Sequence, residues 1–250
     1  MKAEVRGTTL PVLEIQLDPG EAVVSDHGEL AWMSPSMQMA QKTSTGGKGG
    51  LLAGLKRVAG GASIFLTEYA ATGPGATITF ATHLPGTILP VQVGAGHGFI
   101  VHRHGWICGT PEITPSVALQ QTLGGAVFGG EGFILQRLEG EGTAWIELSG
   151  EMTTYTLAPN ETLLAHPGHI GLFEETVQFS ITTVPGIKNK VFGADGFFLV
   201  RLTGPGQIWL QSLTLPGLAA AIAPYLPSQQ AAASNKGGGI ASMVGNILNQ

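Results

Sequence analysis

Three stretches of this chain repeat one pattern of small, apolar and aromatic residues, and no other feature limits the possible folds as strongly. The stretches span residues 58–80, 127–148 and 191–213. In each one a pair of small residues precedes an apolar run, and a G-x-G turn leads into a second apolar run. Because glycine adopts positive φ without a steric penalty, this arrangement predicts a β-hairpin. The repeated positions are Gly60–Gly61, Gly129–Gly130 and Gly193–Ala194 before the strand, Leu66, Leu135 and Leu199 within it, the turns Gly73–Gly75, Gly140–Gly142 and Gly204–Gly206, and Ile78, Trp145 and Trp209 after them.

A second motif alternates with these hairpins and consists of an apolar strand, a Pro-Gly or Pro-Asn turn and a short strand. It begins at Leu17 (LDPGEAVV), His83 (HLPGTILP) and Leu157 (LAPNETLL). Proline fixes φ at the first turn position, and Gly or Asn accepts the left-handed conformation that follows. The two motifs together divide the chain into three units of about 65 to 75 residues. Many short strands separated by turns predict an all-β sandwich or rolled barrel.

The composition agrees with a turn-rich β protein whose surface is largely covered. Charged residues form 12% of the chain, about half of the ~25% typical of soluble domains. The net charge of −5 disfavours nucleic acid as a partner, because that binding depends on Lys and Arg neutralising phosphates. One cysteine, Cys108, leaves no intrachain disulfide, which fits a reducing compartment. The chain shows no signal peptide and no apolar run of about 20 residues, so we expect a cytoplasmic protein without a transmembrane segment.

Several of these segments together resemble the AIM24 family. They are GGLLAGLKRVAGGASIFLTEYAATGPGATITFATHLPGTI and the later VFGGEGFILQRLEGEGTAWIELSGE, and the similarity extends over residues 1–216. The resemblance implies three similar β-sandwich or double-stranded β-helix units in a pseudo-threefold arrangement, related to the tryptophan RNA-binding attenuation protein. It also implies no established enzymatic activity. We expect no cofactor other than a possible bound divalent metal.

The stretch GHGFIVHRHGW, residues 96–106, raises the question of a metal site. His102 and His104 are two residues apart, so on a strand they leave the same face. Paired imidazoles suit a divalent metal when a carboxylate and a third histidine complete the set, as in cupins. Cys108 stands near the place where that pattern needs a glutamate. We expect Phe99, Val101 and Ile107 to face the core and Ile100, His102, His104 and Trp106 to face solvent or an interface.

The composition changes near residue 216, so the β domain is expected over residues 1–216 and a separate tail over residues 217–250. The segment LAAAIAPYLPS predicts a short helix that stops before Pro227, and a flexible linker follows. The last residues place an apolar stripe on one face of a helix, which predicts docking on a partner protein or on the protein's own oligomer. The stripe consists of Ile240, Met243, Val244, Ile247 and Leu248.

These observations predict a non-enzymatic protein that associates with itself, with a trimer as one natural form, and acts as a scaffold or interaction module. Closing exposed strand edges against other copies removes the hazard that such edges pose. One alternative is a metal-dependent, cupin-like enzyme in which His102 and His104 bind the metal. A second alternative is RNA binding in the manner of the attenuation protein, which the acidic charge disfavours.

Overall fold

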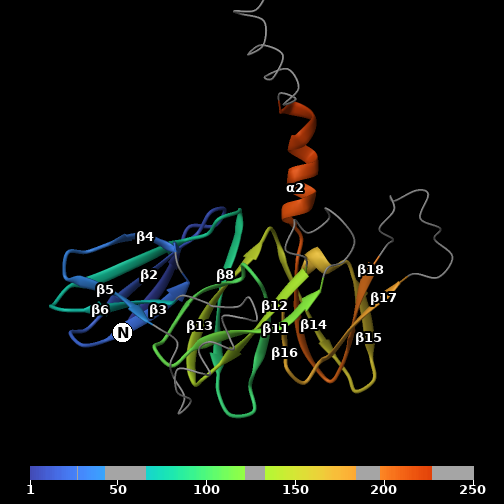
Figure 1. The fold of residues 1–250 in the computed structure, drawn as a ribbon, viewed down its shortest axis with the longest axis horizontal. Helices are drawn as coiled ribbons and strands as arrows, with labels where there is room; N and C mark the ends of the chain where they lie inside the picture. The colour runs from blue at the N-terminus through green and yellow to red at the C-terminus, as the bar shows by residue number, and fades with distance from the viewer. Residues whose placement is uncertain (27, 43–65, 122–132, 184–197, 227–250) are drawn as a thin grey trace, which may run out of the picture. The chain divides into compact units, whose positions relative to one another are not determined.

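The computed structural model describes residues 1–26, 28–42, 66–121, 133–183 and 198–226. The chain divides into two compact parts, Met1–Thr214 and Leu215–Gln250. Every strand of the described residues belongs to the first part, which contains three groups of six consecutive strands preceded by β1 (Lys2–Arg6). We name these groups the first β-unit (residues 12–81), the second β-unit (residues 86–149) and the third β-unit (residues 152–211) (Figure 1).

The strands of the three β-units follow one another in the chain with short connections. The first β-unit contains β2 (Val12–Leu17), β3 (Ala22–Asp26), β4 (Leu30–Met33), β5 (Met37–Lys42), β6 (Leu66–Ala71) and β7 (Ala76–Ala81). The second contains β8 (Gly86–Val93), β9 (Phe99–His102), β10 (Trp106–Gly109), β11 (Thr114–Gln121), β12 (Phe133–Glu139) and β13 (Gly142–Ser149). The third contains β14 (Met152–Leu157), β15 (Thr162–Ala165), η1 (Pro167–His169), β16 (Ile170–Glu174), β17 (Gln178–Thr183), β18 (Phe198–Thr203) and β19 (Gly206–Gln211).

All three β-units have the same topology, a sandwich of two three-stranded antiparallel sheets. In each, the first strand pairs with the sixth and the sixth with the third, as in β2–β7–β4. The second strand pairs with the fifth and the fifth with the fourth, as in β3–β6–β5. The third strand always carries a β-bulge at the same place, between Leu30 and Trp32, Trp106 and Cys108, and Ile170 and Leu172. The prediction of an all-β protein built from three similar sandwich units is confirmed.

The bulges give a more secure alignment of the repeats than the turn glycines do. By strand register, Ala76 corresponds to Gly142 and Gly206, and Thr79 corresponds to Trp145 and Trp209. The expectation that Ile78 matches the two tryptophans is therefore wrong by one residue. The hairpin loop of the first repeat is longer than those of the other two. Counting three residues from Gly75 therefore reaches Ile78, one residue before the corresponding Thr79.

The second glycine of the second and third G-x-G turns adopts a backbone conformation that favours glycine. Gly142 has φ 148° and Gly206 has φ 144° at corresponding positions. Five of the predicted repeat glycines, Gly60, Gly61, Gly129, Gly130 and Gly193, lie outside the described residues.

The β-units are joined edge to edge by main-chain pairing. The third strand of one β-unit pairs antiparallel with the second strand of the preceding one: β10 with β3, and β16 with β9. This pairing produces four sheets of four, six, six and three strands. The strand orders are β1-β2-β7-β4, β5-β6-β3-β10-β13-β8, β11-β12-β9-β16-β19-β14 and β15-β18-β17.

Three apolar cores lie between the four successive sheets. The first core joins the first and second sheets, the second joins the second and third, and the third joins the third and fourth. The two six-stranded sheets thus have a core on each face, and their central strands β9, β10, β13 and β16 lose the usual alternation of buried and exposed residues. In β10, Trp106, Ile107 and Cys108 are all buried. This double coverage accounts for the low content of charged residues.

The same coverage corrects an expectation about the histidine-bearing segment. Ile100 and Trp106 were expected on an outward face, but both are buried, Ile100 in the third core and Trp106 in the second. Phe99 and Val101 lie in the second core. Both faces of β9 are therefore core faces, because β9 is central in a six-stranded sheet.

The described residues of the second part form α2 (Leu215–Ile222), followed by the 3₁₀ helix η2 (Ala223–Tyr225). The predicted short helix before Pro227 is confirmed. No helix in the described part of the chain is long and apolar enough to cross a membrane. The predicted stripe from Ile240 to Leu248 lies outside the described residues.

Candidate functional site

A cluster of carboxylate and imidazole side chains lies where the first and second β-units meet. Glu147, on β13, has a side chain that is only 4% exposed. Its two carboxylate oxygens accept hydrogen bonds from the backbone N–H of His83, at 3.1 and 3.2 Å, and one of them accepts from Leu84 at 3.2 Å. The His83 ring places Nδ1 3.1 Å from Glu147 Oε2 and Nε2 3.7 Å from Glu29 Oε2. One imidazole thus bridges two carboxylates.

The environment of this cluster raises the pKa of both Glu29 and His83. Burial raises the pKa of Glu29 to about 7, with the carboxylates of Asp26 and Glu147 adding to the effect and His83 opposing it. Burial also opposes the charged form of His83, but its bond to Glu147 and the charges of Glu29 and Glu147 prevail and raise its pKa. The pKa values of both Glu29 and His83 are therefore raised, and the two groups lie 3.7 Å apart.

The corresponding position at the second junction holds a neutral side chain. By strand register Gln211, on β19, stands where Glu147 stands on β13. Its Oε1 accepts a hydrogen bond from the backbone N–H of Ser149 at 3.0 Å, and its Nε2 donates to Gly168 O at 3.1 Å. Ser149 in turn corresponds to His83. The Gln211 amide therefore accepts the same type of backbone hydrogen bond as the Glu147 carboxylate. This hydrogen bond does not require the negative charge of Glu147.

Two histidine rings near the junctions also form hydrogen bonds with backbone carbonyl oxygens. The His102 ring Nε2 lies 3.3 Å from the Glu147 carbonyl oxygen, and burial lowers the pKa of His102 to about 4. In the third β-unit, His169 Nδ1 lies 2.8 Å from the Gln211 carbonyl oxygen, which is the corresponding carbonyl. His102 is thus a neutral group that satisfies a strand-end carbonyl.

The predicted pairing of His102 and His104 on one strand face is wrong. Strand β9 ends at His102, and His104 lies in the turn that leads to β10. Burial, followed by the charges of Arg103 and His83, lowers the pKa of His104. Within the ranges that the structure describes, no group of three or more His, Cys, Asp or Glu side chains is placed to hold a metal ion. Cys108 is fully buried, and burial raises the pKa of its thiol far above its ordinary value.

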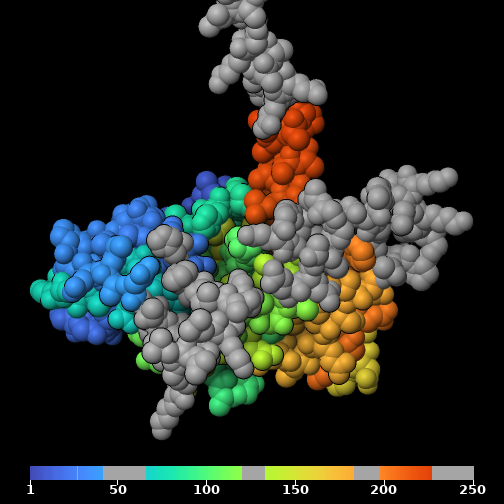
Figure 2. All heavy atoms as spheres, in the orientation of Figure 1, coloured from blue at the N-terminus to red at the C-terminus, as the bar shows by residue number. Residues whose placement is uncertain are grey.

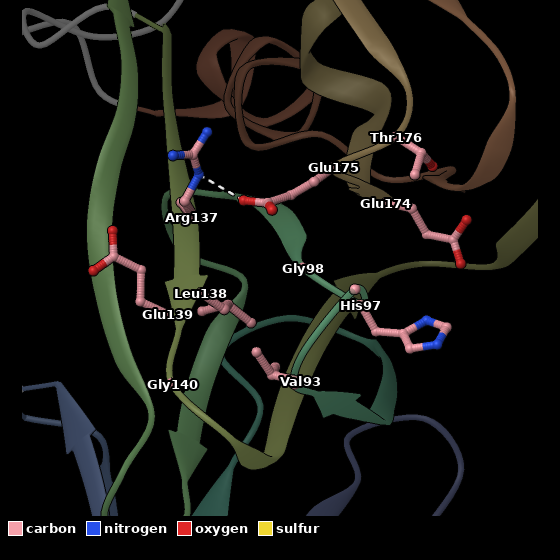
Figure 3. A pocket seen from close by; sticks show the side chains of 12 residues that line it. Val93, His97, Gly98, Arg137, Leu138, Glu139, Gly140, Glu174, Glu175 and Thr176 are labelled. Atoms are coloured by element: carbon pink, nitrogen blue, oxygen red, sulfur yellow. Dashed lines mark ion pairs between the residues drawn. The ribbon is translucent and has the colours of Figure 1, made fainter.

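A hollow of about 640 Å³ lies between the second and third β-units (Figure 3). Arg137 Nε approaches Glu175 Oε1 at 2.6 Å across it. The other two carboxylates that line it are also engaged, Glu139 with the Ser116 hydroxyl at 2.8 Å and Glu174 with the Gln207 N–H at 2.8 Å. Its polar groups therefore stabilise one another, and the residues that line it include no serine, cysteine or lysine.

Two strand edges at the ends of the series are a second candidate site. Strand β4 ends the four-stranded sheet, and β15 ends the three-stranded sheet. They are the third strand of the first β-unit and the second strand of the third β-unit, the two strand types that join units elsewhere in the chain. Each carries a large exposed apolar side chain, Trp32 at 56% and Leu164 at 48% exposure.

Sequence reasoning did not find the cluster of Glu29, His83 and Glu147. One signal was present: the segments AWIELS and IWLQS each place a polar residue two positions after an apolar core position, at matching places in two repeats. A polar side chain inside a buried strand needs a hydrogen-bond partner. The identity of that partner depends on residues 64 positions away, which local patterns do not reveal.

The fold and these sites define a class: an all-β protein of three sandwich units joined edge to edge, with polar junctions. The family described as "Mitochondrial biogenesis AIM24" matches residues 3–213, and the chain belongs to this AIM24 family.

Two similar proteins come from Streptococcus pyogenes. An uncharacterized protein of serotype M6 is 25% identical over 227 residues, which cover 89% of this chain and 90% of that protein. The crystal structure of protein SPYM3_0169 has a TM-score of 0.70 at 20% identity, covering 90% of this chain and 99% of that one. The latter likeness shows the common fold.

Proposed function

We propose that this protein is a non-enzymatic scaffold that associates with copies of itself. The observation that carries the proposal is the pair of terminal edges, β4 and β15. Both are open among the described strands, and both are of the types that pair inside the chain. An unpaired strand edge presents a row of free N–H and C=O groups and is a template for pairing with another chain.

The chemistry of the interior supports a role in assembly. The junction carboxylate Glu147 and the histidine His102 are engaged with backbone groups, and the ion pair of Arg137 and Glu175 spans the hollow between the second and third β-units. A nucleophile paired with a base is the usual mark of covalent catalysis. The described residues of these sites instead form contacts that hold the β-units together.

Native mass spectrometry of the untagged protein tests this function. A scaffold gives masses that are multiples of the 25.8 kDa chain, with the larger species growing as the concentration rises. The same spectrum reports any bound metal. A single 25.8 kDa species at every concentration up to 100-fold above the lowest contradicts self-association.

A further inference from the structure

We propose that β15 of one copy pairs antiparallel with β4 of the next copy, so that the copies assemble head to tail through the same joint that links the β-units inside the chain. This inference rests on the proposed self-association and names its surface. The partner is a second copy of this chain. The two internal joints supply a template for the geometry of this contact.

The internal joints have the same register. At the first joint Cys108 pairs with Ser25 and Gly109 with Val24. At the second joint Leu172 pairs with Val101 and Phe173 with Ile100. The bulge of the third strand fixes the alignment, because Cys108 and Leu172 both follow it directly. The residue just after the bulge thus meets one fixed position of the second strand in both joints.

The same rule assigns the register of the open edges. The residue after the bulge of β4 is Trp32. The residue of β15 that corresponds to Ser25 and Val101 is Ala165, since Ala165 pairs with Val200 as Val101 pairs with Gln136. In the intermolecular joint Trp32 therefore faces Ala165, and Met33 faces Leu164. The large indole is opposite a small side chain, which leaves room for it.

The exposed side chains at these edges correspond to buried ones at the internal joints. The counterparts of Trp32 are Cys108 in the first core and Leu172 in the second, and each contributes to the core of the preceding β-unit. The counterparts of Leu164 are Val24 and Ile100, and each contributes to the core of the following β-unit. Head-to-tail pairing buries Trp32 and Leu164 in the neighbouring copy in the same way, which removes their apolar surface from water.

The other sheet ends are less suited to pairing or have no counterpart joint. Strand β8 contains Pro90 and β11 contains Pro115, and proline lacks the N–H that a ladder needs. Strands β4 (LAWM) and β15 (TLLA) contain neither proline nor a charged side chain. In Figure 2 the first β-unit, which contains β4, forms the blue to cyan surface, and the third β-unit, which contains β15, forms the yellow to orange surface. Because β4 and β15 are different surfaces, the contact is heterologous and closes into a ring or continues as a filament.

Disulfide trapping between two single-cysteine variants tests the register. Met33→Cys and Leu164→Cys are purified separately, mixed and oxidised, and the pair Trp32→Cys with Ala165→Cys is treated likewise. Cross-strand side chains approach most closely at non-hydrogen-bonded pairs, and the two pairs alternate, so at least one is favourable. We expect a species of twice the 25.8 kDa chain in the mixture and at least tenfold less of it with either variant alone. The native Cys108 is buried.

The matched control mixes Trp32→Cys with Leu164→Cys, which the register places on opposite faces. Equal trapping in this control overturns the register. Trapping by a single variant alone overturns the head-to-tail arrangement. A doubly substituted Met33→Cys, Leu164→Cys chain that crosslinks only within itself shows that the two edges meet inside one chain, and it overturns the intermolecular joint.

Edge variants separate this inference from the proposed function. Trp32→Glu and Leu164→Glu each introduce a charge at an exposed site, and we expect each to shift the protein to the mass of one chain with unchanged circular dichroism. Tyr155→Glu, at another exposed strand position on β14, is the control and keeps the assembly. If the wild type assembles and both edge variants still do, the edge pairing is overturned while the scaffold function stands. If the wild type is a monomer, both are overturned.

Discussion

The two junctions between β-units solve one structural problem with different chemistry. At each junction, a backbone N–H at or just after the end of one β-unit donates a hydrogen bond to a side chain on the last strand of the next β-unit. At the first junction Glu147 accepts a hydrogen bond from the backbone N–H of His83. At the second junction Gln211 accepts one from the backbone N–H of Ser149. The first junction adds an imidazole and a second carboxylate, His83 and Glu29, within 3.7 Å of each other. The backbone contact is therefore the shared requirement, and the charges of the first junction are what distinguishes it.

Both junctions also place a glycine at or just before the start of the next β-unit, Gly86 at the first and Gly150 at the second. A Cβ on Gly86 would overlap the carbonyl oxygen of Leu148, and one on Gly150 would overlap the Ser212 hydroxyl. Glycine is thus required because the end of the last strand of the same β-unit, or the residue just after it, approaches closely. The comparison separates features that the joint needs, glycine and an acceptor, from features that only one joint has.

The largest expected effect comes from filling the glycine position. Gly86→Ala forces the start of β8 away from β13, and we expect it to lower the free energy of unfolding by about 3 kcal/mol. Urea denaturation followed by circular dichroism measures the change. Gly73→Ala is the control, since its nearest neighbour would be Ser36 Cβ at 3.9 Å. An equal effect of both variants would show that close approach at the junction is not the cause.

Removing the acceptor comes next in size. Glu147→Ala leaves the N–H groups of His83 and Leu84 without their acceptor, and we expect a loss of about 2 kcal/mol. Gln211→Ala should cost a similar amount, because it leaves the N–H of Ser149 unpaired. Glu147→Gln should cost less than about 1 kcal/mol, since an amide already suffices at the second junction. If Glu147→Gln is as damaging as Glu147→Ala, the carboxylate rather than the acceptor holds the first junction.

The charges of the first junction predict a pH effect. The pKa of Glu29 is about 7 in the folded protein and has an ordinary value of 4.5. Between these values the folded state holds more protons than the unfolded state, so the free energy of unfolding falls as the pH rises. The raised pKa of His83 acts in the same direction, because its contribution is lost as the pH rises through the folded pKa.

Glu29→Gln removes the larger of these two titrations. We expect the stability of this variant relative to the wild type to rise between pH 5 and pH 8, by on the order of 1 kcal/mol. Urea midpoints measured at four pH values test this. A difference that stays flat across the range contradicts the raised pKa. Gln211→Glu places a carboxylate at the second junction, as at the first. Its urea midpoints test whether a carboxylate alone makes the stability depend on pH.

The smallest expected effect concerns the hollow between the second and third β-units. Arg137 and Glu175 are 52% and 38% exposed, and exposed ion pairs contribute about 0 to 1 kcal/mol. Arg137→Ala should therefore change the free energy of unfolding by about 0.5 kcal/mol, and by less at high salt. Arg201→Ala, at the same repeat position in the third β-unit, is the matched comparison. A decrease of more than about 2 kcal/mol in the free energy of unfolding would mean that this ion pair contributes strongly to holding the second and third β-units together.

The hairpins and the number of β-units could be predicted from the sequence because they depend on residues close together in the chain. The turn glycines Gly142 and Gly206 and the matching leucines Leu66, Leu135 and Leu199 fall in the same register in the sequence and in the sheets. The faces of β9 could not be predicted. Alternation indicates one buried face only when the other meets water, and β9 meets a core on each side.

The sequence by itself determined the repeated sandwich unit, its Pro-turn and its hairpin, because short-range turn geometry and strand composition specify them. Only the tertiary structure decided how the β-units join. The joints pair strands that are far apart in the chain, and they bring Glu29, His83 and Glu147 together from separate β-units. Strands β4 and β15 belong to the same two strand types, but each lies at the end of a sheet among the described strands. The repeat pattern specifies each β-unit, whereas the pairing between β-units depends on contacts between strands that are distant in the chain.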